Sequence, residues 1–309
     1  MTVLIIGASG FLGTELVHQA TSAGRVTAAT FNSRPGDASG TSWHHLDLRH
    51  PRRLDEIIDT VAPSMVINAS SGEADWAVTA DGPVRLAEAT ARRGIGLVHV
   101  SSDAVFSGSH VHYDETALPD PITPYGAAKA AAETAVRLLH PASVVARTSL
   151  ITGDGRSAHE RVVHELAGGA REGALFTDDI RCPVHVADLA AALWELAVSD
   201  AAGVFHLAGC DALSRYALGV LIARRDGVDP SLLPAGRRAD THLLGALDVR
   251  LNSQATQRRL SIRLRGAREF LGAATAAADA NTDVMHADAE IFDQVRPQAE
   301  ILPNCEDIV

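Results

Sequence analysis

The chain has 309 residues, of which 46% are hydrophobic and 21% charged, and its formal net charge is −11. These values fit a globular protein with one large α/β domain or a domain plus a smaller lobe. The negative charge argues against nucleic acid and anionic membranes as partners, and neither an apolar run of about 18 residues nor a basic leader is present. We therefore expect a cytoplasmic protein.

The first half predicts a parallel sheet wrapped by helices, because short apolar runs alternate with longer amphipathic ones. We expect the strands at residues 3–6, 26–31, 43–46, 65–69, 96–101 and 143–147. We expect the helices at residues 11–22, 52–60, 73–92 and 124–139. This order predicts a Rossmann-type doubly wound parallel sheet over residues 1–150, a fold that binds NAD(P).

The second half predicts a smaller substrate-binding lobe over residues 151–271, with some segments returning to the first domain. Helical patterns recur at residues 157–171, 187–198, 214–225, 253–260 and 264–271, with a strand-like run at 204–208. From Gly272 to Val309 there are eight acidic residues against Arg296 alone, a net charge of −7. Residues 272–309 therefore predict a flexible acidic tail.

A glycine-rich turn follows the first predicted strand directly and leads into a helix. It reads Gly7-Ala8-Ser9-Gly10-Phe11-Leu12-Gly13. Glycines at such a turn let the backbone approach a pyrophosphate, which the N–H groups of the following helix bind. The spacing is GxxGxxG instead of GxGxxG, but the strand before it and the helix after it favour dinucleotide binding.

The end of the second strand bears on which dinucleotide binds. It reads Phe31-Asn32-Ser33-Arg34 and lacks the acid that usually holds the ribose of NAD. Arg34 is suited to a 2′-phosphate, which favours NADPH and leaves NADH open. Asp47, after the third strand, is placed to contact the adenine.

Tyr125 and Lys129 are four residues apart on one predicted helix, so they share a face. Of the 27 basic residues, Lys129 is the only lysine, which indicates chemistry that arginine cannot perform. We expect the ammonium to lower the pKa of the Tyr125 phenol and to hold the nicotinamide ribose. Ser102, at the end of the fifth strand, is placed to hydrogen-bond a substrate carbonyl.

Several segments together resemble the extended short-chain dehydrogenase/reductases, and among them the dTDP-4-dehydrorhamnose reductases. The resemblance covers residues 1–271 and rests on Ser101–Gly108, His112–Glu115, Pro124–Lys129, Val78–Pro83, Arg181–Ala190 and Asp248–Asn252. It implies Ser102, Tyr125 and Lys129 as catalytic residues. It also implies cofactor contacts at Gly10, Phe11, Leu12, Asp47, Leu48, Ala69, Ser70 and Ser71.

Two departures from the family pattern concern the active site. The segment between Asn68 and Thr79 is about ten residues shorter than in the family, and Thr79 replaces a helix asparagine that supports the lysine in many relatives. We expect a small-molecule substrate, such as a nucleotide-linked 4-keto-6-deoxysugar or another polar ketone of a biosynthetic pathway. Arg181 is suited either to a substrate phosphate or to a surface ion pair.

Three functions stay open at this point. The first is reduction of a ketone by NAD(P)H, the second is a sugar epimerase or dehydratase that recycles bound NAD, and the third is a non-catalytic NADP-binding regulatory subunit. A homodimer is also open. The three cysteines and the scattered histidines, His44-His45 and His110/His112 among them, predict neither a disulfide framework nor a metal site.

Overall fold

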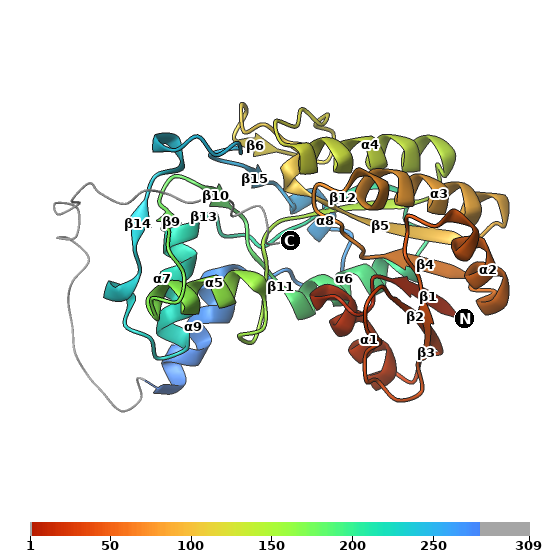
Figure 1. Cartoon of the computed structure of the whole chain (residues 1–309), viewed down its shortest axis with the longest axis horizontal. Helices are drawn as coiled ribbons and strands as arrows, with labels where there is room; N and C mark the ends of the chain where they lie inside the picture. Colours follow the sequence, from red (N-terminus) through yellow and green to blue (C-terminus); the bar gives the residue numbers. More distant parts are fainter. Residues whose placement is uncertain (1, 279–309) are drawn as a thin grey trace.

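The computed structural model describes residues 2–278, and a seven-stranded parallel sheet forms the larger part of the molecule (Figure 1). The strand order is β12-β7-β5-β4-β1-β2-β3. In that order the strands span Gly203–Leu207, Val144–Thr148, Gly96–Ser102, Met65–Asn68, Val3–Ile6, Thr27–Phe31 and Ser42–His45. The chain winds outward in both directions from β1, so the predicted doubly wound fold is confirmed.

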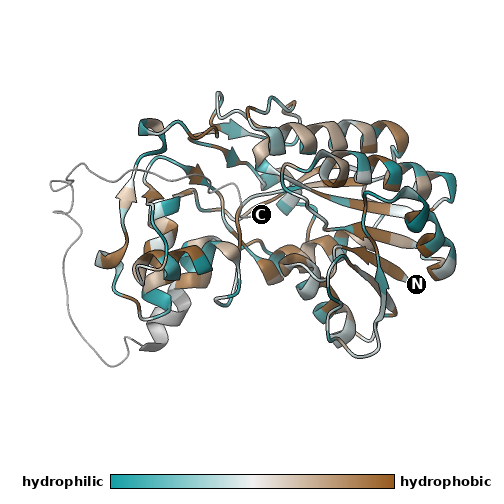
Figure 2. Cartoon of the chain, in the orientation of Figure 1, coloured by the Kyte–Doolittle hydropathy of each residue, from teal (hydrophilic) through white to brown (hydrophobic). Residues whose placement is uncertain are grey.

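Helices cover both faces of this sheet, which explains why its strands are apolar runs instead of alternating ones. Figure 2 shows this apolar character along the central strands. On one face lie α1 (Phe11–Ser22) and α6 (Val186–Ala197), and on the other lie α2 (Pro51–Val61), α3 (Gly82–Arg92) and α4 (Pro124–Leu139). Each face therefore has its own hydrophobic core.

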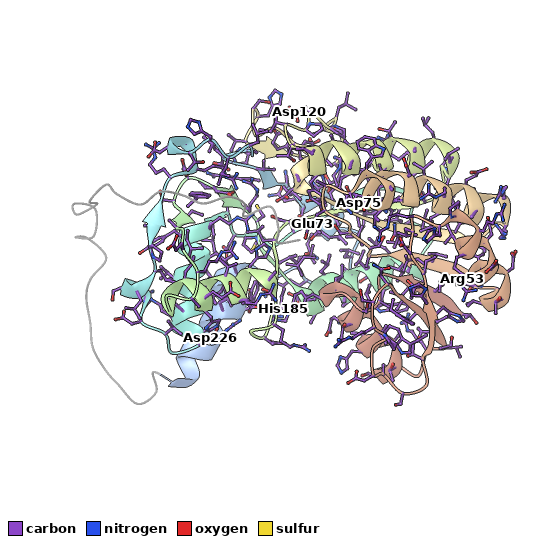
Figure 3. All side chains as sticks on the ribbon, viewed as in Figure 1. Arg53, Glu73, Asp75, Asp120, His185 and Asp226 are labelled. Atoms are coloured by element: carbon purple, nitrogen blue, oxygen red, sulfur yellow. The ribbon has the colours of Figure 1, made fainter. Side chains whose placement is uncertain are left out.

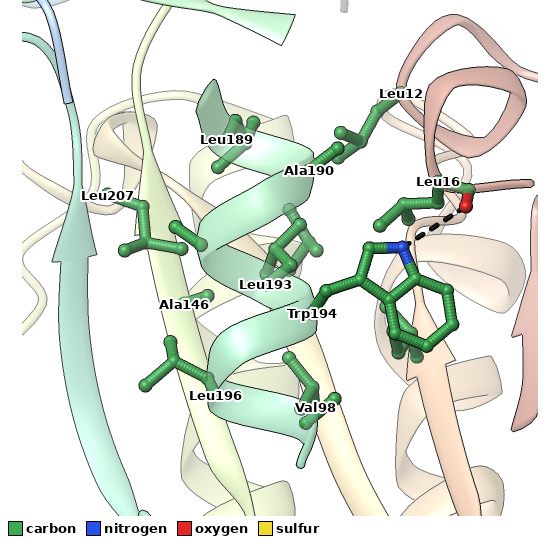
Figure 4. Packing of buried hydrophobic residues seen from close by; sticks show 14 of the residues in the cluster. Leu12, Leu16, Val98, Ala146, Leu189, Ala190, Leu193, Trp194, Leu196 and Leu207 are labelled. Carbon is green, nitrogen blue, oxygen red and sulfur yellow. Dashed lines mark hydrogen bonds between the residues drawn. The ribbon is translucent and has the colours of Figure 1, made fainter. Parts of the chain in front are cut away.

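The packing of α6 shows how the second half of the chain completes the first (Figure 4). Leu189, Leu193 and Leu196 are almost fully buried against the sheet. The Trp194 indole packs beside α1, and its Nε1 donates a hydrogen bond of 3.1 Å to the Leu16 carbonyl. Burial of each such leucine stabilises the fold by about 1.5–3 kcal/mol, so α6 belongs to the core of the sheet.

The smaller lobe has a third core, built mainly on α5 (Ala158–Ala167), α7 (Arg215–Arg225) and α9 (Ala267–Ala278). Ser157 and Glu160 form a capping box that starts α5. The described residues also form four short strand pairs: β9 (Leu175–Phe176) with β14 (Ala235–Gly236), β10 (Ile180–Arg181) with β13 (Leu213–Ser214), β8 (Ile151–Thr152) with β11 (Val184–His185), and β6 (His112–Tyr113) with β15 (Arg250–Leu251). The remaining short elements are η2 (Asp103–Val105), η3 (Pro230–Leu232), η4 (Arg238–Asp240) and α8 (Gln254–Gln257).

The structure differs from the expected elements mainly at three places, while the helices expected at 157–171 and 253–260 are shorter, at Ala158–Ala167 and Gln254–Gln257. The helix expected at residues 73–92 begins later, with a π-helical turn η1 (Ala77–Asp81) that leads into α3. The run expected at 204–208 in the smaller lobe is the edge strand β12 of the main sheet, paired with β7. Helix α9 continues to Ala278, past the expected end at residue 271, and the rest of the acidic tail lies outside the described residues. Every helix in the described part of the chain is too short or too polar to span a bilayer.

Candidate active site

A cleft with a volume of about 450 Å³ opens at the carboxyl ends of the parallel strands, between the sheet and the smaller lobe. The ends of β1, β2, β5 and β7 border it on one side, and residues of the smaller lobe border it on the other. Because β1 lies between β2 and β4, this is the point where the strand order reverses. Open α/β sheets bind their ligands at this point.

The glycine turn forms the floor of the cleft, as the sequence predicts. Gly7, Ser9, Gly10, Phe11 and Leu12 line it. Gly7 has a φ of +76°, and a Cβ there would come within 2.8 Å of the Ser70 backbone. Gly10 is the N-cap of α1 and provides no side-chain cap, so the first N–H groups of the helix are open to a pyrophosphate.

Gly13 has a structural role besides the expected one. It does not line the cleft; a Cβ at this position would collide with the Gly7 carbonyl oxygen. Gly13 therefore allows the first turn of α1 to pack closely on the Gly7-Ala8 backbone, and its role in cofactor binding stays a prediction.

The other expected cofactor contacts divide in two groups. Asp47, Leu48, Ala69, Ser70 and Ser71 all line the cleft. The Asp47 carboxylate also accepts a 2.9 Å hydrogen bond from the Arg49 side chain, which lowers the pKa of Asp47. Arg34 is exposed and lies outside the lining residues, whereas Asn32 lies within them. The role of Arg34 stays a prediction.

The start of α4 brings Tyr125 to Ser102. Thr123 caps the helix by accepting a 3.0 Å hydrogen bond from the Gly126 N–H, and Pro124 occupies the first turn. A side chain at Gly126 would collide with the Ala104 carbonyl. The glycine therefore lets the helix approach η2 closely, and Ser102, Tyr125 and Lys129 all line the cleft.

The electrostatics of this group differ from the expectation. Burial raises the pKa of Tyr125, and hydrogen bonds with Ser102 and Ser71 only partly oppose the rise. Lys129 Nζ donates a hydrogen bond of 3.1 Å to the Val100 carbonyl and lies 5.9 Å from the centre of the Tyr125 ring. The expected lowering of the phenol pKa is therefore wrong for this structure, because loss of solvation outweighs the two serine hydrogen bonds. Tyr125 is protonated at neutral pH, as a general acid must be.

Lys129 itself is strongly affected by its surroundings. Its side chain is buried, with 3% of the residue exposed. Burial lowers the pKa of Lys129 to about 8, although the Glu133 carboxylate one turn along the helix favours the charged form. At pH 7 the ammonium is mostly present, and it is lost when the pH rises above 8.

A buried network that the sequence reasoning missed supports Ser102. Asp103 accepts a 2.6 Å hydrogen bond from the Ser149 hydroxyl, and its carboxylate lies 3.7 Å from Arg181 Nε. Burial raises the pKa of Asp103, and the Arg181 guanidinium opposes that rise. Asp103 lies in the Ser101–Gly108 segment, directly after Ser102, but nothing in that segment indicates that Ser149 and Arg181 contact it.

Arg181 belongs to a cluster on the far side of the cleft that the sequence did not reveal. Three guanidiniums surround the fully buried Asp179: Arg181 Nη1 at 2.9 Å, Arg238 Nη2 at 3.1 Å and Arg215 Nε at 3.4 Å. Burial would raise the pKa of Asp179, but these cations lower it. All three arginines line the cleft. Three guanidiniums against the carboxylates of Asp179 and Asp103 leave a net positive charge facing the cleft, which suits an anionic ligand.

Thr79 holds the segment before η1 in place. Its hydroxyl donates to the Glu73 carbonyl at 2.8 Å and accepts from the Gly72 N–H at 3.1 Å. Glu73 has the left-handed φ of 53°. Figure 3 shows Glu73 and Asp75 near the centre of the molecule, above the level of His185. Thr79 therefore stabilises the loop that contains Ser71, whose side chain hydrogen-bonds Tyr125.

The part of the chain that the structure describes contains no group of three histidine, cysteine or acidic side chains suited to a metal ion.

Comparison with known proteins gives consistent relatives. A family model described as RmlD substrate binding domain matches residues 1–278. A dTDP-4-dehydrorhamnose reductase of Mycobacterium tuberculosis is 35% identical over 239 residues, covering 74% of this chain and 76% of that protein. A dTDP-4-keto-6-deoxy-D-glucose reductase of Streptomyces niveus is 29% identical over 239 residues, with 74% and 79% covered.

Solved structures show the same fold. A hypothetical dTDP-4-dehydrorhamnose reductase from Sulfolobus tokodaii superposes with a TM-score of 0.74 at 26% identity, covering 86% of this chain and 97% of that one. The dTDP-4-dehydrorhamnose reductase of Bacillus anthracis in complex with NADP gives 0.73 at 22% identity, with 89% and 98% covered. These findings confirm the expected resemblance and the oxidoreductase class: the chain belongs to the RmlD substrate-binding-domain family of extended short-chain dehydrogenase/reductases.

Proposed function

We propose that the protein uses NADPH to reduce the ketone of a nucleotide-linked 4-keto-6-deoxysugar. The observation that carries this proposal is one cleft in which a glycine turn, the Ser102–Tyr125–Lys129 group and an arginine cluster face a common space. The relatives named as reductases of such sugars, and the NADP complex among the similar structures, support it. NADH stays possible as the cofactor.

The residues of the cofactor side fit a dinucleotide. The uncapped start of α1 suits the pyrophosphate, and the ends of β3 and β4 provide Asp47, Ala69 and Ser70 along the same side. When bound, the cofactor supplies the hydride to the ketone carbon. Lys129, with an ammonium mostly present at pH 7, is placed to hold the nicotinamide ribose.

The proton comes from the protein. Tyr125 keeps its proton at neutral pH because burial raises the pKa of the phenol. Ser102, which hydrogen-bonds Tyr125, is placed to orient the substrate carbonyl so that its oxygen accepts this proton as the hydride reaches carbon.

The arginine cluster suits the nucleotide part of the substrate. Arg181 donates 2.7 Å and 2.8 Å hydrogen bonds to the Ala246 and Ile180 carbonyls, so its guanidinium is held rigidly. Together with Arg215 and Arg238, it supports diphosphate binding. A surface ion pair, the alternative for Arg181, does not describe a side chain that is only 10% exposed.

Turnover assays test this proposal. The purified protein is mixed with NADPH and either dTDP-4-keto-6-deoxyglucose or dTDP-4-dehydrorhamnose, and loss of NADPH absorbance is compared with product formed. We expect one NADPH per product and no turnover by Tyr125→Phe, which should still bind NADPH. Isomerisation without NADPH consumption would support an epimerase, and NADPH binding without turnover on either substrate would support a regulatory subunit.

The homodimer and the cytoplasmic location also stay predictions. Light scattering of the purified protein tests whether it forms a homodimer.

A further inference from the structure

His159 lies beside the arginine cluster and has no part in the chemistry described so far. It is the second residue of α5, directly after the capped start of the helix, and it lines the cleft together with Arg181, Arg215 and Arg238. The residue is partly buried. His159 therefore borders the region that suits a phosphate.

The hydrogen bond to Arg215 determines which nitrogen of His159 carries the proton. Arg215 Nη1 lies 3.1 Å from His159 Nδ1. A guanidinium has only N–H donors, so Nδ1 must accept with its lone pair. The neutral ring then carries its hydrogen on Nε2. Among the described residues, Nε2 has no hydrogen-bond partner. It is also not fully buried, since it is absent from the buried atoms that lack a partner. It is thus a donor open to a ligand.

The ring is also held in place. Arg215 Nε lies 3.4 Å from the Asp179 carboxylate, which in turn binds Arg181 and Arg238. Asp179 is fully buried, so the chain from Asp179 through Arg215 to His159 is anchored in the core of the lobe. Such second-layer contacts fix the direction in which a donor points.

We propose that His159 is a substrate-binding residue whose Nε2–H donates a hydrogen bond to a phosphate oxygen of the substrate, with Arg215 and Asp179 as positioning residues. This rests on the proposed function, because it takes the diphosphate of a nucleotide-linked sugar as the ligand. A phosphate is favoured over a sugar hydroxyl, because the ring contacts Arg215, a guanidinium of the cluster that suits an anion.

His159 performs this role without titrating in the working range. Burial, and then the positive charge of Arg215, lower the pKa of His159 to about 3. The ring is therefore neutral above that value. Its charge therefore stays constant near neutral pH, whereas an ordinary histidine would change its charge near pH 6.5.

Calorimetry with inorganic pyrophosphate, dTDP and thymidine tests the proposal on the full chain. We expect His159→Leu to weaken pyrophosphate and dTDP by about ten- to a hundredfold, the range for a hydrogen bond to a charged group, and to leave thymidine unchanged. His159→Gln retains both an acceptor for Arg215 and a donor for the ligand, so it should recover most of the affinity. His18→Leu, at an exposed histidine of α1, is the matched control.

A double-mutant cycle separates a direct contact from an effect through Arg215. If His159 contacts the phosphate, His159→Leu should still weaken pyrophosphate in the background of Arg215→Met. The ratio of wild-type to His159→Leu affinity should also stay constant between about pH 5.5 and 8.

Three results would overturn the proposal: equal binding by His159→Leu and wild type, no added loss in the Arg215→Met background, or no pyrophosphate and dTDP binding by the wild type. These measurements need no turnover. If the reductase assay fails but His159→Leu still weakens pyrophosphate and dTDP binding, the result counts against the proposed function alone.

Discussion

Replacement of Lys129 by arginine tests the mechanism most directly. The substitution keeps the positive charge, and the chain uses arginine at all 26 other basic positions. If Lys129 were only a cation, the exchange would cost almost nothing. The proposed mechanism instead requires a compact ammonium at one place, between the Val100 carbonyl and the nicotinamide ribose.

The surroundings of Lys129 set the size of the expected effect. With 3% of the residue exposed, the Lys129 side chain is almost enclosed by its neighbours, so the bulkier guanidinium cannot place its charge where the ammonium lies without moving them. A displacement of about 1 Å in an active site can cost about a hundredfold. We therefore expect kcat/KM to fall by about ten- to a thousandfold, the upper part matching loss of acid–base assistance.

The assay measures kcat/KM for NADPH-dependent reduction of the keto-sugar across pH. For the wild type we expect activity to fall as the pH rises through about 8, because deprotonation then removes the Lys129 ammonium. Lys129→Arg should lack this fall, since a guanidinium stays charged. Arg137→Lys, an exposed position on the same helix, is the matched control and should leave both rate and profile unchanged.

Folding must be measured together with the rate. Overpacking costs typically about 1–3 kcal/mol, so urea unfolding and NADPH binding should show that Lys129→Arg is folded and loaded. Full turnover by a folded Lys129→Arg would refute the reasoning, and so would a wild-type pH profile in the variant.

Two further predictions concern the cofactor and the core. Arg34→Ala should weaken NADPH by about ten- to a hundredfold and leave NADH unchanged, because only NADPH has a 2′-phosphate; equal losses in fluorescence titrations of the two cofactors would reject Arg34 as the selecting residue. Arg147 and Glu133 form an ion pair of 2.8 Å in which only 1% and 2% of the two side chains are exposed. Glu133→Ala should therefore lower the free energy of unfolding by about 3–5 kcal/mol, because it leaves the buried guanidinium of Arg147 without its carboxylate. Urea unfolding of the double Glu133→Met/Arg147→Met protein should recover much of that loss, and if the double variant is as unstable as the single one, the unpaired charge is not the cause.

The fold class and the reacting side chains were predictable because their signals are local. A glycine turn between a strand and a helix identifies a dinucleotide site within about ten residues. The four-residue spacing of Tyr125 and Lys129 places both on one face of a helix whose cap and first turn are also encoded locally. Most of the sheet could be predicted for the same reason, since a buried parallel strand is a short apolar run.

Only the tertiary structure determined how distant segments meet. β12 joins the main sheet because β7 provides an open edge, which no pattern within residues 203–207 records. Arg215 and Arg238 have no motif of their own, and they become a site with Arg181 because three separate segments converge on Asp179. The direction of the Tyr125 pKa shift was missed for a related reason. Sequence spacing shows which charge is near a phenol, but loss of solvation depends on everything packed around it, and here that loss is the larger effect.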